Sequence, residues 1–245
     1  MDAILEGFGW LVDPVNWSGF NGIPARVAEH MQMTLYAVAI SALIAIPLGT
    51  YIGHARRFEF LAVSSGTLAR SLPSFGILGI VFAIESLSTI GEIGFTPTLV
   101  ALVALAFPVI LINTYVGVKE VDPDMVEAAR GMGMTGLEVL RRLEVPLATP
   151  LMIAGIRTAS VQVVATATLA AVGGWGGLGR YIIDGRATRD FAEITGGAIL
   201  VAILAILIEV GLGLVERVVS PKTSTDRRDS RRQQQTAEAE AAAAA

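Results

Sequence analysis

Few side chains in this sequence combine the types and spacing that catalysis or metal binding requires. There is no cysteine, and His30 and His54 lie far apart without partners at ligand spacing, so we predict no metal site and no cofactor. A phosphate-binding loop of the form GxxxxGK needs a lysine directly after a glycine, but neither Lys119 nor Lys222 follows one. We therefore expect that this chain hydrolyses no nucleotide and is not an enzyme.

Charged side chains stand out where long apolar stretches surround them. Arg70, Arg157 and Glu209 each interrupt such a stretch. If these stretches cross a membrane, an unpaired charge at mid-bilayer costs at least ~2.5–3.5 kcal/mol, so the charges need partners. Arg157 and Glu209 would lie at similar depths, and we predict that they pair or share a polar network, with Arg70 as a competitor. The pair would hold two helices in register.

Uncharged polar side chains form a second pattern. Thr158, Gln162 and Thr166 are spaced i, i+4 and i+8, so a helix would place them on one face. Together with Ser74 and Asn113 on other helices, they are candidates to line a translocation path. Interhelical hydrogen bonds, worth ~1 kcal/mol or less per contact, would explain the same residues without a path. Both interpretations stay open at this point.

The elements that must carry these side chains are long apolar helices. Hydrophobic residues make up 53% of the 245 residues and the mean hydropathy is +0.62, which is more apolar than an ordinary soluble domain. A transmembrane helix needs roughly 17–25 mostly apolar residues. The sequence therefore predicts an all-α membrane protein with about five transmembrane helices. The expected spans are residues 31–53, 60–84, 97–118, 147–172 and 195–219.

Lysine and arginine are concentrated in the segments that would lie on one side of the membrane. Because cytoplasmic loops carry an excess of these residues, the pattern places the N-terminus outside and the C-terminus in the cytoplasm. Trp10, Trp17 and Trp175 then fall on the outer side, where an aromatic belt accounts for them. The basic side reflects topology and does not indicate nucleic-acid binding. Its residues are Arg56, Arg57, Lys119, Arg130, Arg141, Arg142, Arg217, Lys222, Arg227, Arg228, Arg231 and Arg232.

Three regions follow from this pattern. Residues 1–30 would form an extracytoplasmic N-terminal segment, either a short interfacial helix or a loop. Residues 31–219 would form the transmembrane domain. Residues 220–245, which are polar and end in an alanine- and glutamate-rich run, are expected to be a disordered cytoplasmic tail. The protein would be a multi-pass protein of a cell membrane.

A glycine-rich loop follows the fourth expected span on the outer side. Gly174, Gly176 and Gly179 match GxGxxG, but no strand precedes them, so a dinucleotide site is not expected. With Trp175 and Gly177, these residues indicate a flexible turn near an outer gate that a partner touches. A plain tight turn is the alternative.

The segment between the third and fourth spans begins with helix-starting residues. Asp122 is suited to cap a helix whose first position is Pro123, and Glu127 favours the positive end of the helix dipole. Ala128 and Ala129 are small enough to let another surface approach closely. A polar helix of this kind between apolar spans is a candidate contact for a soluble partner.

Glycines interrupt this helix. Gly131 and Gly133 are expected to break it, and Thr135 with Glu138 fits a capping box that starts a second short helix. Pro146 is expected to end that helix and to begin the fourth span. Two short helices joined at glycines would form a rigid elbow that transmits the movement of a partner. An amphipathic helix lying on lipid headgroups is the alternative.

Residues 127–146 resemble the EAA motif of binding-protein-dependent ABC transporter permeases. In that motif EAA is followed by three residues, a glycine, nine residues and Ile-x-Leu-Pro, and this chain has EAA at 127–129, Gly133 and LEVP at 143–146. Leu143 and Val145 replace the usual Ile and Leu conservatively. The resemblance extends over residues 34–219. ARSLPSFGIL at 69–78 resembles methionine-importer-like permeases, whereas the stretches at 146–159 and 168–185 resemble the osmoprotectant branch.

The resemblance implies a complex. Two permease subunits, of the same or a related chain, would form the pore, with ATP-binding cassette ATPase subunits inside and an extracytoplasmic substrate-binding protein outside. Residues 120–145 would be the cytoplasmic coupling helix. Glu127, Ala128, Ala129 and Gly133, with Gly131 beside them, would contact the ATPase. The remaining partner is the lipid bilayer, and no nucleic acid is expected.

The function implied is that of the pore subunit of an ATP-driven importer for quaternary-ammonium osmoprotectants, namely glycine betaine, choline, carnitine or proline betaine. A methionine or other amino-acid importer subunit is the alternative within this class. An ion-coupled secondary carrier would need acidic or broken-helix ion sites at mid-membrane, of which the spans offer little beyond Glu209. A non-transporting scaffold would leave the capped, glycine-jointed elbow unexplained.

Overall fold

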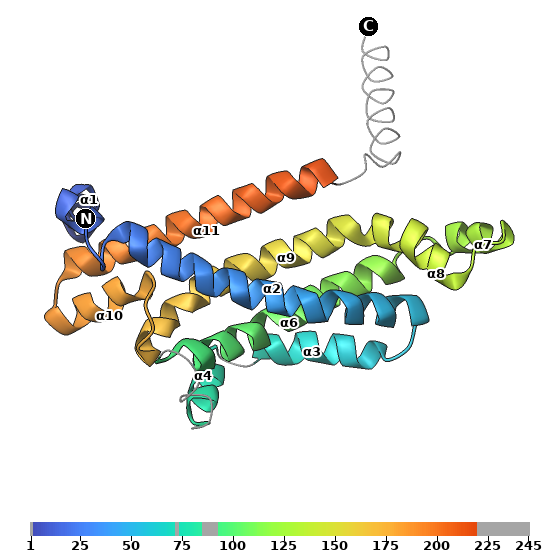
Figure 1. Cartoon of the computed structure of the whole chain (residues 1–245), viewed down its shortest axis with the longest axis horizontal. Coiled ribbons are helices and arrows are strands. Elements are labelled where there is room, and N and C mark those ends of the chain that lie inside the picture. Colours follow the sequence, from blue (N-terminus) through green and yellow to red (C-terminus); the bar gives the residue numbers. More distant parts are fainter. Residues whose placement is uncertain (1, 72–73, 85–92, 220–245) are drawn as a thin grey trace, which may run out of the picture.

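The structure, a computed structural model, describes residues 2–71, 74–84 and 93–219, and every regular element in these ranges is helical. Figure 1 shows an elongated bundle whose long helices run side by side along one axis. The four longest helices are α2 (Ile23–Ala55), α6 (Phe95–Lys119), α9 (Val145–Ala167) and α11 (Phe191–Val219).

Four helical stretches within the described residues are long and apolar enough to cross a membrane. They are α2, α6, the continuous stretch Gly136–Gly173 that contains α9, and α11. These correspond to the first, third, fourth and fifth expected spans. Helix α2 begins at Ile23, so the end of the expected N-terminal segment already belongs to the first long helix.

The second expected span has a different form. In place of one helix over 60–84, the structure has α3 (Glu59–Ser71, 13 residues) and α4 (Ser74–Phe82, 9 residues). Figure 1 shows α4 turning away from the direction of α3. The sequence places Pro73 between them, and a residue that precedes a proline disfavours the helical conformation, so a single helix is difficult to continue there. Residues 72–73 themselves lie outside the described part of the chain.

Helices α2, α6 and α9 form the main core, and α2 and α6 meet almost backbone to backbone. A Cβ atom added at Gly49 would lie 2.9 Å from the carbonyl oxygen of Leu111, and one added at Gly53 would lie 2.7 Å from Cβ of Val118. Glycines spaced by four residues let two membrane helices approach closely, and the packing this permits is a main source of helix association in lipid. The buried residues of this core are Met33, Ala37, Ala45, Ile52, Ala62, Leu102, Ala106, Ile110, Leu111, Tyr115, Ala159, Val163 and Ala167.

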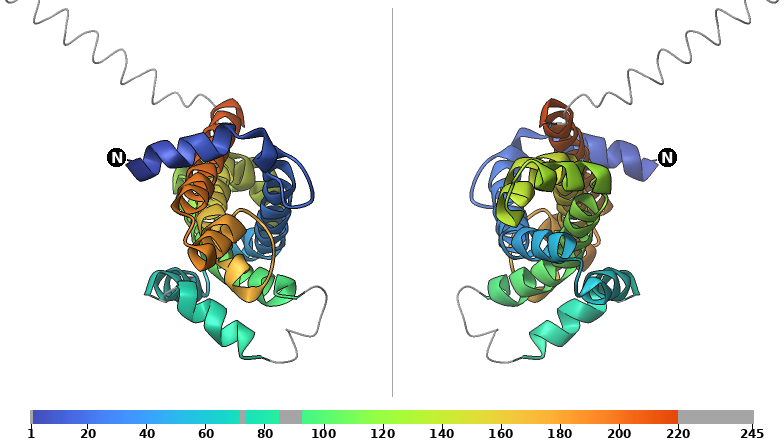
Figure 2. Two further views of the ribbon diagram at one scale, coloured as in Figure 1. Left: turned by 90° about the vertical axis from the view of Figure 1, so that its left-hand side faces the viewer. Right: turned by 90° about the vertical axis from the view of Figure 1, so that its right-hand side faces the viewer.

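The N-terminal residues form a separate helix, α1 (Asp2–Val12), which lies across α11 rather than along the bundle (Figure 2). A 3-10 turn, η1 (Pro14–Trp17), leads from α1 towards α2. Helix α10 (Gly179–Thr188) packs against α11 at the same end of the bundle. Of the two possibilities that the sequence leaves open for residues 1–30, a short helix is therefore the one present.

Helix α11 is the least covered of the long helices. None of the residues in its most apolar stretch is buried in the single chain. A wide apolar surface of this kind needs lipid or a further subunit to cover it. Beyond Phe191 at its start, its exposed large apolar side chains include Ile203, Ile206, Leu207, Val210, Leu214, Val215 and Val218.

Candidate functional site

The segment between α6 and α9 forms the expected elbow. Helix α7 (Pro123–Gly131) and the short α8 (Gly136–Val139) project beyond one end of the bundle (Figure 1). The carboxylate of Asp122 accepts a hydrogen bond from the backbone N–H of Asp124 at 2.9 Å, and Pro123 occupies the first helical turn. The helix start predicted from Asp122 and Pro123 is therefore confirmed.

The two short helices are joined at Gly133. Its φ of +88° is a left-handed conformation that residues with a Cβ rarely adopt, so the sharp turn depends on glycine. Thr135 and Glu138 form the predicted capping box. Glu138 Oε2 accepts from the N–H of Thr135 at 2.9 Å, and Thr135 Oγ1 accepts from the N–H of Glu138 at 3.4 Å.

Pro146 does not end the second helix, contrary to our expectation. The chain runs from α8 through a π-helical turn, Leu140–Glu144, directly into α9. In this turn the N–H of Val145 donates to the carbonyl of Leu140, five residues back. A proline lacks an N–H and collides with the carbonyl four residues back in an α-helix, and the wider turn accommodates it. The second helix of the elbow, α8, is thus continuous with α9, whereas α7 is set off from both by the turn at Gly133.

The residues of the EAA motif divide between two environments. Glu127, Ala128, Gly131 and Gly133 are exposed, whereas Ala129 is 4% exposed. A Cβ atom added at Gly131 or Gly133 would meet no atom within 4 Å. The motif therefore places small residues on an open surface, where a partner could approach the backbone closely.

Apolar side chains lie exposed on the same segment. Met125, Met132 and Leu137 are 45%, 78% and 57% exposed. Methionine and leucine side chains that nothing covers in the single chain are typical of a surface that another protein or a membrane covers. The two methionines were not expected from the sequence, although Met132 lies between Gly131 and Gly133.

A hydrogen bond attaches the base of the elbow to the bundle. Nδ1 of His54, in the last turn of α2, lies 2.5 Å from Oε2 of Glu144, whose side chain is 8% exposed. The two residues are far apart in the sequence, and sequence reasoning did not pair them. The other histidine, His30, is buried with its Nε2 at 3.0 Å from the carbonyl oxygen of Val164, so it joins α2 to α9.

Arg157 of α9 reaches two carboxylates of α11. Its Nε lies 3.6 Å from Oε1 of Glu209, the partner expected from the sequence, and its Nη1 lies 3.1 Å from Oε2 of Glu216. Glu216 was not foreseen, although its spacing of seven residues from Glu209 places both on one face of α11. The side chain of Arg70 lies outside the described part of the structure. These ion pairs hold α9 against α11.

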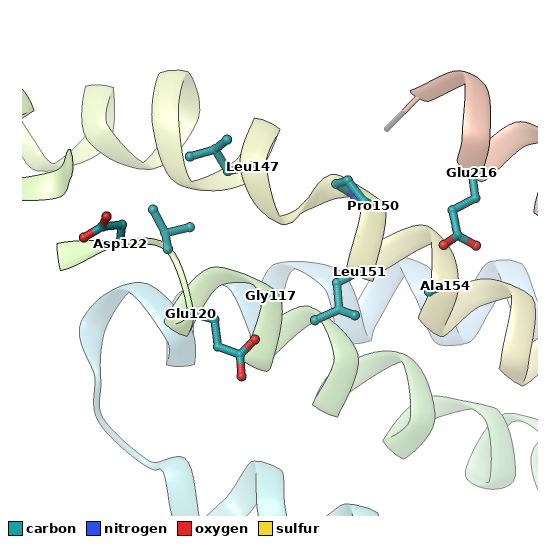
Figure 3. A pocket seen from close by; sticks show the side chains of 9 residues that line it. Gly117, Glu120, Asp122, Leu147, Pro150, Leu151, Ala154 and Glu216 are labelled. Carbon is teal, nitrogen blue, oxygen red and sulfur yellow. The ribbon is translucent and has the colours of Figure 1, made fainter. Parts of the chain in front are cut away.

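A cleft of about 360 Å³ opens beside this network, close to the elbow (Figure 3). Glu120 and Asp122 contribute carboxylates from the end of α6 and the start of the elbow, and Glu216 contributes one from α11. Leu147 and Leu151 of α9 supply apolar walls. The cleft is therefore bounded by α6, α9 and α11, next to the start of the elbow.

The proposed polar stripe on α9 satisfies much of its own hydrogen bonding. The hydroxyls of Thr158 and Thr166 each donate to the carbonyl four residues back on their own helix, at 2.9 and 2.8 Å, and the amide of Asn113 does the same on α6 at 2.7 Å. Thr158 is exposed in the single chain, and Gln162 and Thr166 are half-buried. The side chain of Ser74 lies outside the described residues.

The glycine-rich loop of residues 173–179 packs closely against its neighbours. The N–H of Gly177 donates to Oε2 of Glu29 at 2.7 Å, and a Cβ atom added at Gly179 would collide with the carbonyl of Thr168. Gly174 and Gly177 adopt φ values of +89° and +83°. The indole ring of Trp175 meets Phe95 edge to face, with centroids 4.8 Å apart. This geometry fits the tight turn better than an open, partner-contacting loop.

A bundle of apolar helices long enough to span a bilayer, with a capped polar elbow at one end, defines a helical multi-pass membrane protein. The chain belongs to the family of binding-protein-dependent transport system inner membrane components, whose model matches residues 45–225. The family resemblance carried by the EAA motif is thereby confirmed. As an inner membrane permease component the chain is non-catalytic.

Two relatives cover most of the chain. The glycine betaine/carnitine/choline transport system permease protein OpuCB of Bacillus subtilis (strain 168) is 39% identical over 80% of this chain and 88% of its own length. The osmoprotectant import permease protein OsmW of Salmonella typhimurium (strain LT2) is 32% identical over 79% of this chain and 90% of its own length.

The fold is similar to that of a solved transporter. A chain of the MetNI methionine ABC transporter, in an inward facing conformation, matches with a TM-score of 0.68 and 25% sequence identity. The match covers 80% of this chain and 95% of that chain.

Proposed function

We propose that this chain is the transmembrane pore subunit of an ATP-driven importer for quaternary-ammonium osmoprotectants such as glycine betaine, choline, carnitine and proline betaine. The observation that carries the proposal is the similarity, over about four-fifths of the chain, to a permease named for glycine betaine, carnitine and choline and to one named for osmoprotectant import. The subunit would sit in the cell membrane with its N-terminus outside, its C-terminus in the cytoplasm and residues 220–245 as a cytoplasmic tail.

The elbow is the proposed contact with the ATPase. Ala128, Gly131 and Gly133 offer an open surface of small residues beside the exposed Glu127, and the exposed Met132 would enter a groove of the partner. Because α8 continues into α9 through the π-helical turn, a push on the elbow moves α9 directly. Because His54 is bonded to Glu144 at the base, the same push is passed to α2.

The resulting cycle is one of alternating access. Closure of the ATPases on ATP would bring the elbows of two permease subunits together and open the pore outward, and hydrolysis would reset it. The path would run along α9 past Thr158, Gln162 and Thr166. The hydroxyls of Thr158 and Thr166 bond within their own helix, which leaves this face polar without tying them to another helix. Selectivity would reside mainly in the binding protein that delivers the cargo.

Reconstitution of the complete complex in proteoliposomes tests this function. We expect ATP-dependent uptake of at least one of radiolabelled glycine betaine, choline and carnitine, and no uptake of methionine. Uptake of methionine alone would favour the amino-acid importer that the MetNI-like fold also suits. Uptake that persists after the ATPase is inactivated would instead indicate an ion-coupled carrier and would contradict the proposal.

A further test addresses the path. Cysteine at Gln162 or Thr166 in the reconstituted complex should react with a water-soluble thiol reagent, and the rate should change when ATP is trapped on the ATPase. The sequence contains no cysteine, so each variant reports one position. If neither position reacts in any state of the cycle, the stripe faces protein and the path lies elsewhere.

A further inference from the structure

Helix α1 divides lengthwise into three sectors of different chemistry. Successive residues of an α-helix are rotated by about 100°, so the side chains of this helix point in well-separated directions. One sector packs on the rest of the chain, one is apolar and exposed, and one is polar or side-chain-free. The packed sector is Gly7, Trp10 and Leu11; the apolar sector is Ile4, Leu5, Phe8 and Val12; the polar sector is Glu6 and Gly9.

The packed sector fixes α1 firmly on α11. A Cβ atom added at Gly7 would lie 2.8 Å from Cγ2 of Thr195, and one added at Gly196 would collide with the indole ring of Trp10. The ring of Trp10 also meets Tyr181 edge to face at 4.9 Å. Burial raises the pKa of the Tyr181 hydroxyl to about 12, so it stays protonated and donates to the carbonyl of Asn21 at 2.8 Å.

The end of α1 is also held in place. The side-chain amide of Asn16 donates to the carbonyl of Trp10 at 2.8 Å, and the indole N–H of Trp17 donates to the carbonyl of Leu11 at 2.7 Å. These bonds satisfy carbonyls that a helix end leaves without partners. The rotation of α1 about its own axis is therefore set by contacts at both its face and its end.

The apolar sector is uncovered in the single chain. Ile4, Leu5, Phe8 and Val12 are 55%, 65%, 52% and 77% exposed. Four large apolar side chains on one side of a helix of 11 residues form a continuous strip. Glu6 and Gly9, which are also exposed, lie on the other side of the same helix.

The direction of each sector follows from the neighbours of Trp10. Trp10 lies at the edge of the packed sector, next to the polar sector. Its side chain lines a polar cleft of about 370 Å³ together with Asn16, Asp190 and Glu193. Asp190 directly precedes α11 and Glu193 lies in its first turn. The polar side of α1 therefore faces the start of α11, and its apolar side faces along α11 towards the exposed apolar side chains from Ile203 onward.

We propose that α1 binds the lipid bilayer as an interfacial helix, with Ile4, Leu5, Phe8 and Val12 among the acyl chains and Glu6 in the aqueous phase. The helix lies crosswise to the bundle and projects from its side (Figure 2), which is the orientation of a helix in the plane of a membrane surface. Its apolar strip continues the apolar surface of α11, which the bilayer must already cover wherever no other subunit does. The leaflet is the outer one if the orientation proposed above holds.

Spin labels on single cysteines test this placement. The chain has no native cysteine, so Phe8→Cys and Val12→Cys can be compared with the matched controls Glu6→Cys and Gly9→Cys on the same helix. The assembled complex is placed in phospholipid nanodiscs, and the collision rates of each nitroxide with oxygen and with a water-soluble nickel chelate are measured. We expect the oxygen-to-nickel ratio to be several-fold higher at Phe8 and Val12 than at Glu6 and Gly9.

Other occupants of the strip give different results. Equal ratios at all four positions would overturn the proposal. Labels at Phe8 and Val12 that are water-accessible in lipid and become protected only when the binding protein is added would assign the strip to that protein. Strong dipolar coupling between labels of two subunits at these positions would assign it to a second copy. Because the spin-label measurement uses no cargo, its result does not depend on the outcome of the uptake experiments.

Discussion

Two glycine-rich segments, one at each end of the bundle, look alike in the sequence and differ in the structure. In the elbow, a Cβ atom added at Gly131 or Gly133 would meet nothing within 4 Å. In the glycine-rich loop of residues 173–179, a Cβ atom added at Gly176 would collide with Glu29, and one added at Gly179 would collide with the backbone at Thr168. In the elbow, glycine leaves the surface open at Gly131 and allows the left-handed turn at Gly133. In the loop, glycine is required at Gly176 and Gly179 because there is no room for a side chain.

The difference assigns different roles to the two ends. The loop is part of the packing of this chain, so changes there should act on folding. The elbow is exposed and attached mainly through its base, so changes on its surface should act on association with a partner. Substitutions at each end test whether the loop acts on folding and the elbow surface on association with a partner.

The largest effect is expected at the base of the elbow. His54→Ala leaves the buried carboxylate of Glu144 without its hydrogen-bond partner, and a buried polar group left unpaired typically lowers the free energy of unfolding by ~1–3 kcal/mol, and by more where the group is charged. Because the side chain of Glu144 is only 8% exposed, we expect a loss at the upper end of this range. Chemical denaturation in detergent measures the change. The double variant with Glu144→Ala should recover part of the loss, and a double variant no better than the single one would show that the contact carries no coupling.

A smaller loss of stability is expected from a change in the glycine-rich loop of residues 173–179. Gly179→Ala forces the added methyl group against the carbonyl of Thr168, and overpacking of this kind costs about 1–3 kcal/mol. The same denaturation experiment applies. An unchanged denaturation midpoint would show that the loop backbone can shift to make room for the methyl group. It would contradict the contrast in packing between the loop and the elbow.

A change on the open surface of the elbow should spare stability and impair assembly. Ala128→Glu introduces a charge where a partner would approach the backbone, and we expect affinity for the ATPase subunit to fall by about tenfold, or ~1.4 kcal/mol. The control is Asp124→Ala on the same helix. A normal affinity in the Ala128 variant, measured on the purified components, would place the contact outside the motif.

The smallest effect is expected at the end of α7. Gly131→Ala fills open space in the last residue of the helix, and because alanine restricts the unfolded chain more than glycine, stability should rise by roughly 0.5–1 kcal/mol. Transport in proteoliposomes should nevertheless decrease if the ATPase touches this backbone. A loss of stability would contradict the open environment of Gly131.

The parts that the sequence predicted well depend on short-range signals. The start of α7 at Pro123 and the capping box of Thr135 and Glu138 follow from residues within one helical turn of each other. The four long spans follow from apolar composition alone. The ion pair of Arg157 with Glu209 could be anticipated because an isolated charge in an apolar stretch needs a partner at similar depth.

The parts that the sequence did not predict depend on local conflicts or on distant contacts. The second span appears as α3 and α4, because composition cannot show whether a proline bends or divides a helix. The continuity of α8 with α9 requires a π-helical turn before Pro146, and no short sequence pattern indicates such a turn. His54 and Glu144 meet only because α2 and the elbow end at the same place, and that is a property of the fold.

The contact of α2 with α6 at Gly49 and Gly53 limits how this subunit can change shape. Where two backbones touch without side chains between them, a slide by one residue would press Leu48 or Thr50 into the space beside α6 that Gly49 leaves. The two helices are therefore expected to move as one unit. A change of shape is then expected first where side chains separate two helices, as between α9 and α11, which meet through Arg157, Glu209 and Glu216.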